Sequence, residues 1–156
     1  MDSNLKHILE LAIAFEKESY HFYTTLKNRV KEPQVIEILE QLATAELGHR
    51  KKLETILHQG ITEGQEIFKK LKPREVEDMK LSDYLQPVKL DNSSTFQDIM
   101  IAAMHREKGA YDFYRTMAKL AATNDAKALF EFLAAEELEH KSTLERLYDE
   151  EVYTEF

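Results

Sequence analysis

The chain has 156 residues, no cysteine and a formal charge of −8. This length fits one domain, which we expect to span residues 1–156. The lack of cysteine excludes disulfides, thiolate zinc sites and iron–sulfur clusters, and the excess of acidic over basic residues argues against a nucleic-acid surface. No apolar run reaches the roughly 18 residues of a membrane span, and the start lacks the features of a signal peptide. We therefore expect a cytoplasmic protein with no nucleic-acid or membrane partner.

Long helices are predicted because only 4 Gly and 3 Pro interrupt the chain. Apolar side chains at helical spacing predict a first helix over residues 4–30 and a second over 34–58. Pro33 suits the first turn of the second helix, and Gly60 lies just past its end. The stretch 60–92 shows no long apolar period, so we expect a crossover there.

Within the crossover, short helices are predicted over residues 63–71 and 74–79. A capping-box pattern that begins at Ser94 opens a third helix, predicted over 95–122. Residues 123–125 then form a short turn that caps a fourth helix, predicted over 126–148 and followed by a tail. Two antiparallel helical hairpins joined by a long crossover predict an all-α, ferritin-like four-helix bundle.

The two predicted hairpins resemble each other in sequence. Residues 16–23 (EKESYHFY) match residues 107–114 (EKGAYDFY) at five of eight positions, at an offset of 91 residues. Residues 42–49 match residues 133–140 at the same offset. One offset that serves two separate motifs indicates an internal duplication of a helical hairpin.

Charged side chains interrupt the apolar stripes of these repeated motifs, although a buried carboxylate is costly unless something compensates it. Two of the helices carry one such glutamate each, and the other two carry a Glu-x-x-His pair, whose members share a helix face. At about 1.5 Å per residue, all of these side chains lie roughly 20 Å from the turn of their hairpin. We therefore expect six side chains to converge at mid-bundle: Glu16, Glu46, His49, Glu107, Glu137 and His140.

Four carboxylates carry a charge of −4, which two divalent cations would balance. Carboxylate and imidazole ligands suit iron, manganese or zinc. Tyr23 and Tyr114 each lie two helical turns from a candidate glutamate, and they are expected either to pack in the core or to place a hydroxyl group beside the metal ligands. The remaining histidines and two further glutamates are expected at the surface: His7, His21, His58, His105, Glu10 and Glu145.

One glutamate on each of two helices, with Glu-x-x-His on the other two, is the ligand pattern of ferritin-like di-metal carboxylate proteins. The EKESYHFY and AELGH segments and their second copies resemble the rubrerythrin branch of that superfamily most closely. The resemblance extends over all four long helices. It implies that the six converging residues bind two iron ions, with manganese or zinc as alternatives in the isolated protein.

The sequence departs from that branch at identifiable places. Rubrerythrins proper carry a rubredoxin-like domain with four cysteines and a further glutamate three residues after the third-helix ligand, where this chain has Ala110. Bacterioferritins have a haem-binding methionine directly after the second-helix glutamate, where this chain has Leu47. We therefore expect no haem, and we expect electrons to come from a separate donor protein.

The resemblance implies a non-haem di-iron oxidoreductase that reduces peroxide or oxygen. A ferroxidase that oxidises Fe(II), and a metal-binding bundle without turnover, remain open as alternatives. At the level of the family, a homodimer is expected.

Overall fold

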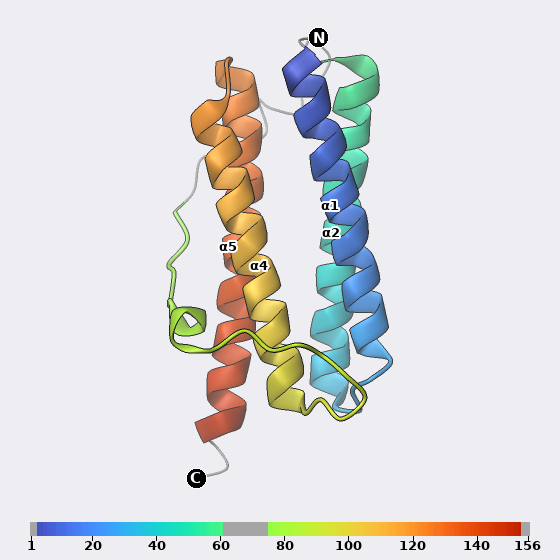
Figure 1. Ribbon diagram of the computed structural model, residues 1–156, viewed down its shortest axis with the longest axis vertical. Helices are drawn as coiled ribbons and strands as arrows, with labels where there is room; N and C mark the ends of the chain where they lie inside the picture. The colour runs from blue at the N-terminus through green and yellow to red at the C-terminus, as the bar shows by residue number, and fades with distance from the viewer. Residues whose placement is uncertain (1–2, 61–74, 154–156) are drawn as a thin grey trace. The chain divides into compact units, whose positions relative to one another are not determined.

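The computed structural model describes residues 3–60 and 75–153, and within them the helices form two antiparallel hairpins (Figure 1). The hairpins belong to two compact units, Met1–Leu71 and Lys72–Phe156. Among the described residues there is no strand, and no helix is long and apolar enough to cross a membrane. The predicted all-α class, with two helical hairpins joined by a long connection, is confirmed. The elements are α1 (Ser3–Lys27), α2 (Pro33–Gln59), the 3-10 helix η1 (Leu81–Tyr84), α4 (Phe96–Leu120) and α5 (Asn124–Tyr153).

The first hairpin pairs α1 with α2 through the short connection 28–32. Pro33 stands in the first turn of α2, as predicted. Gly60 ends α2 with a φ of 77°, a left-handed conformation that glycine adopts without steric cost, and its N–H donates to the Ile56 carbonyl. The helix α1 ends at Lys27 and not at residue 30. Buried Val30 continues the apolar spacing of α1 although it lies beyond the helix.

The second hairpin pairs α4 with α5, and both helices begin with a side-chain cap. Thr95 and Asp98 form a reciprocal capping box, one residue later than the pattern predicted, because Ser94 instead accepts a hydrogen bond from the N–H of Asp91. At the start of α5, the hydroxyl oxygen of Thr123 accepts from the N–H of Ala126, which confirms the predicted cap.

Several boundaries in the second unit differ from prediction. The helix α4 ends at Leu120 and not at residue 122, and α5 begins at Asn124, inside the predicted turn. The helix α5 continues to Tyr153, so the tail predicted from residue 149 was wrong over its first part. Neither glycine nor proline follows residue 148, and glutamate is a good helix former, so nothing local ends the helix there. The predicted helix 63–71 and residue 74 lie outside the described residues. Residues 75–79 are not helical, and the short helix stands at η1 instead.

The capping box of α4 yields a stability prediction. Thr95→Ala removes the oxygen that accepts from the Asp98 N–H, so we expect the free energy of unfolding to fall by about 1 kcal/mol. Urea unfolding measures this difference. The control is Thr116→Ala, at an exposed position in the interior of the same helix, where the better helix propensity of alanine should leave stability unchanged or slightly raised. Equal losses in the two variants would contradict the capping role.

Candidate metal centre

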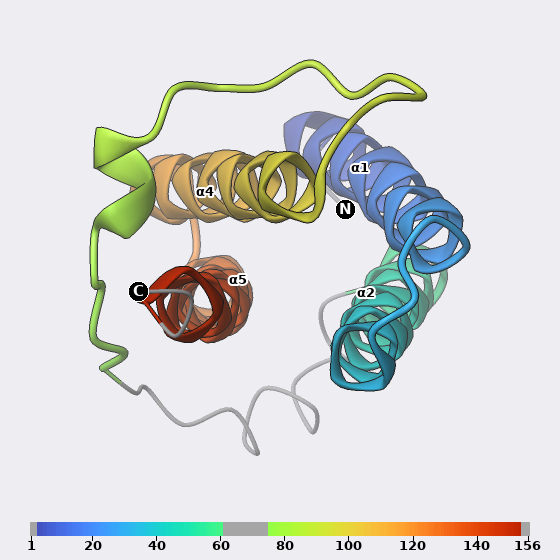
Figure 2. The ribbon, with the colours of Figure 1, turned by 90° about the horizontal axis from the view of Figure 1, so that it is seen from below.

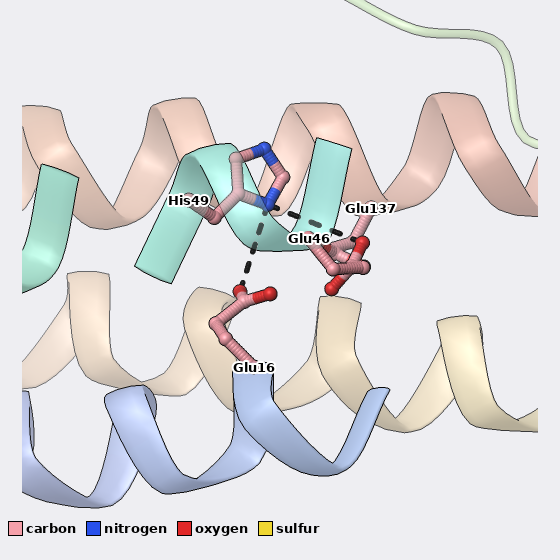
Figure 3. A group of neighbouring side chains, drawn as sticks. All are labelled: Glu16, Glu46, His49 and Glu137. Carbon is pink, nitrogen blue, oxygen red and sulfur yellow. Dashed lines mark ion pairs between the residues drawn. The ribbon is translucent and has the colours of Figure 1, made fainter. Parts of the chain in front are cut away.

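In the first hairpin, α1 and α2 bring together Glu16, Glu46 and His49 (Figure 3). Their ligand atoms all lie within 4.8 Å of one another. His49 Nδ1 is 3.6 Å from Glu16 Oε1 and 4.0 Å from Glu46 Oε1. All three side chains are buried, and the two glutamates are 0% exposed. The predicted convergence within this hairpin is therefore present.

The second hairpin repeats the arrangement with Glu107 from α4 and with Glu137 and His140 from α5. His140 Nδ1 is 3.7 Å from Glu107 Oε2 and 3.9 Å from Glu137 Oε2. Both glutamates are buried, whereas the His140 side chain is 14% exposed. The 91-residue duplication thus produces the same cluster twice.

Local sequence explains why each cluster forms. Glu46 and His49 are three residues apart on α2, so they emerge from one face of the helix. Glu16 belongs to the buried stripe of α1 that includes Ala12 and Tyr23. Because α1 and α2 run antiparallel from a short connection, residues at similar distances from that connection meet at one level.

The geometry of each cluster suits a metal ion. An imidazole nitrogen and a carboxylate oxygen 3.6 to 4.0 Å apart are too far apart for a hydrogen bond. Metal–ligand bonds of about 2.1 Å place two ligands of one ion about 3 to 4 Å apart. In both clusters the Nδ1 atom is the ring nitrogen nearest the carboxylates, and Figure 3 shows the other ring nitrogen of His49 turned away from Glu16. Nδ1 is therefore the atom that can bind a metal.

The electrostatics of the second cluster show what burial does to these carboxyl groups. Burial raises the pKa of Glu107 well above its ordinary value, and the neighbouring Glu137 raises it further. His140 lowers it by a smaller amount. Without a cation, the Glu107 carboxyl group therefore tends to keep its proton.

Both candidate tyrosines are fully buried, each in its own hairpin. The ring of Tyr114 stacks on Phe130 with centroids 6.4 Å apart, and the ring of Tyr23 meets Phe22 edge-on at 5.3 Å. These contacts agree with core packing. A hydroxyl role beside the metal ligands stays a prediction.

Two of the residues expected at the surface lie elsewhere. His7, His21, His58 and Glu10 are exposed, as predicted. His105 is half-buried and its Nε2 lies 2.8 Å from the Leu85 carbonyl oxygen, while Glu145 is 0% exposed. The surface prediction was wrong for Glu145 because residues 77–85 contact α5 beside it.

The sequence reasoning also missed Lys141 and Ser142, which follow His140 and are both buried. A weak signal existed. Lys141 and Glu145 are spaced i, i+4, and at the 91-residue offset they correspond to Arg50 and Glu54. Such pairs usually lie on an exposed helix face, so the spacing alone could not indicate burial.

A comparison with protein-family models finds a match to the model described as Rubrerythrin over residues 7–148. No curated protein matches the chain. The matched range contains both Glu/His clusters and most of each of the four long helices. The chain therefore belongs to the rubrerythrin family.

Proposed function

We propose that this chain is a non-haem di-iron oxidoreductase that reduces peroxide or oxygen with electrons from a separate donor protein. The observation that carries the proposal is the pair of repeat-related clusters, each with two buried carboxyl groups and an imidazole. In this proposal the two hairpins combine their clusters into one centre. Four carboxylates and two neutral imidazoles then balance two divalent cations.

Each hairpin would supply three of the six metal ligands. Glu16, Glu46 and His49 would supply one set of ligand atoms, and their counterparts in the second hairpin would supply the other. Ala110 is buried and offers no ligand atom, so the second hairpin presents the same donor types as the first. Two ferrous ions held by these residues would supply the two electrons needed to reduce peroxide to water.

Burial also changes the proton affinity of one of these side chains. Because the pKa of Glu107 is raised, its carboxyl group keeps a proton to a higher pH than an exposed glutamate does when no cation is present. A cation favours the ionised form, so metal binding would release that proton. Burial also lowers the effective dielectric constant around the carboxylates, which strengthens their attraction for a cation.

Turnover distinguishes this function from the alternatives. The reconstituted protein, given excess hydrogen peroxide and a chemical reductant, should consume many equivalents of peroxide per chain. Oxidation of added Fe(II) without repeated peroxide reduction would instead indicate a ferroxidase. Bound metal with neither activity would indicate a metal-binding bundle and would overturn the proposed redox function.

The first prediction from the proposed function concerns the number of iron ions bound per chain. After reconstitution with ferrous iron in the absence of oxygen, elemental analysis should approach two iron ions per chain. Glu46→Ala and Glu137→Ala should each weaken iron binding sharply, because the duplication makes these two positions equivalent. A saturating value of one iron or none would contradict the di-metal centre. Unchanged binding in one variant would show that its hairpin supplies no ligand.

The second prediction concerns stability without metal. Glu16→Gln combined with Glu107→Gln removes two buried carboxyl groups, so in chelator we expect the double variant to be more stable by about 1 kcal/mol or more. It should also lose most of the stabilisation by added Fe(II) or Zn(II), because ions bind the folded centre better than the unfolded chain. Thermal unfolding measures both effects. Glu10→Gln with Glu131→Gln, at two exposed positions, should show neither.

The third prediction concerns pH. Because the folded protein raises the pKa of Glu107, this group stabilises the metal-free fold fully below its unfolded pKa, and the stabilisation disappears as pH rises through the folded pKa. Urea unfolding in chelator, from about pH 5 to about pH 8, should therefore show wild type losing stability relative to Glu107→Gln as pH rises. Parallel curves for the two proteins would contradict the raised pKa. The exposed Glu131→Gln should run parallel to wild type.

A further inference from the structure

Residues 77–85 cross the outside of the second hairpin and are attached to both of its helices. Figure 2 shows η1, in green, beside α4. On the α5 side, buried Lys141 Nζ donates to Asp78 Oδ1 at 2.6 Å and to Glu145 Oε1 at 2.9 Å. The N–H of Ser82 donates to Glu145 Oε2 at 2.8 Å. A single buried cation thus joins this segment to α5.

Further contacts attach the same segment at both helices. Ser142 Oγ donates to the Glu77 carbonyl oxygen at 2.8 Å. On α4, Lys108 Nζ donates to Asp83 Oδ1 at 2.6 Å, and His105 Nε2 donates to the Leu85 carbonyl oxygen at 2.8 Å. The 77–85 segment therefore spans α4 and α5 from outside.

The positions of these attachments are informative. His105 and Lys108 lie two residues before and one residue after Glu107. Lys141 and Ser142 directly follow His140. These four residues thus lie within one helical turn of a candidate metal ligand, and Glu145, which accepts from the Ser82 N–H, lies five residues after His140. The segment therefore contacts the hairpin at and just beyond the level of its Glu/His cluster.

Charge and backbone both indicate that the segment is firmly held. The buried Lys141 ammonium group lies between two carboxylates, with Asp78 Oδ1 at 2.6 Å and Glu145 Oε1 at 2.9 Å. Burial raises the pKa of Asp78, but its bonds from Lys141 and the Lys80 N–H outweigh this and leave the pKa lowered. Lys80 has a φ of 55°, a left-handed conformation that is unfavourable for lysine and persists between the anchored residues Asp78 and Ser82.

The first hairpin provides an internal comparison. Arg50 and Glu54 occupy the positions equivalent to Lys141 and Glu145, and Arg50 Nε donates to Glu54 Oε1 at 2.8 Å. Their side chains are 31% and 38% exposed, whereas those of Lys141 and Glu145 are 2% and 0% exposed. Within residues 3–60, no segment covers this pair. The duplicated hairpins therefore share the ion pair and differ in the segment attached to it.

We propose that the 77–85 segment braces α4 and α5 at the level of Glu107 and His140, with Lys141 as the main positioning residue. It makes the ligand set of the second hairpin more rigid than that of the first, and so holds one of the two metal ions more tightly. The metal part of this proposal rests on the proposed function, whereas the bracing of the helices does not.

Lys141→Met and its repeat-equivalent control Arg50→Met test the brace in the full chain. In the metal-free proteins, hydrogen exchange of α4 and α5 amides around Glu107 and His140 should be faster in Lys141→Met than in wild type. Exchange in α1 and α2 should not change in this variant. Arg50→Met should leave exchange around Glu107 and His140 unchanged. Equal acceleration across all four helices, or none, would overturn the brace.

Metal titration followed by the absorption of bound Co(II) supplies the second measurement. Lys141→Met should weaken one of the two binding steps by about tenfold and leave the other unchanged, whereas Arg50→Met should leave both unchanged. Two unaltered steps in Lys141→Met would overturn the positioning role. Fewer than two binding steps in wild type would overturn the proposed di-metal centre, and with it the tighter binding of one metal ion by the second hairpin. Hydrogen exchange would still test whether the 77–85 segment braces α4 and α5.

Asp78→Asn keeps the proposal testable if Lys141→Met does not fold. This variant removes a charge from the segment itself, while Lys141 keeps its partner Glu145. It should speed exchange around His140 and weaken the same metal-binding step, by less than Lys141→Met. A folded Asp78→Asn protein with wild-type exchange and wild-type binding would overturn the proposal.

Discussion

Carboxyl groups that are removed from water cost free energy, and the two hairpins bury four of them at repeated positions. Two responses can offset this cost. A proton can neutralise the group, as the raised pKa of Glu107 indicates for the metal-free protein, or a cation can bind. The rest of each hairpin serves to hold two carboxyl groups and one imidazole at one level, because only a shared position lets a single ion compensate both charges.

Because of helix geometry, only a few residues are needed to specify this arrangement. A Glu-x-x-His pair on one helix and a glutamate on its antiparallel neighbour are enough, provided that the connection between the helices is short. Copying the hairpin copies the cluster, as the matching His49 and His140 distances show. In the proposed function, metal binding would be coupled to folding, because a cation would offset the cost of burying the two carboxyl groups of each cluster.

Outside the clusters the two hairpins differ in what covers them. The partly exposed Arg50–Glu54 pair and the buried Lys141–Glu145 pair have the same spacing and the same chemistry. Exposed pairs of this kind contribute little to stability, whereas a buried charge needs all of its partners. Asp78 and the Ser82 N–H supply those partners in the second hairpin. A duplicated fold can in this way acquire a difference between its halves without any change of ligand.

The sequence by itself determined the helical class, the hairpin pairing and the side chains of both Glu/His clusters, because periodicity, short connections and the 91-residue repeat are local or regular signals. The prediction ended the fourth helix at residue 148, although no glycine or proline follows, and α5 continues to Tyr153. Only the tertiary structure decided that Glu145 and Lys141 are buried and that His105 bonds to Leu85. Those contacts join residues 20 to 65 positions apart in a segment without periodicity, and no local pattern encodes such a meeting.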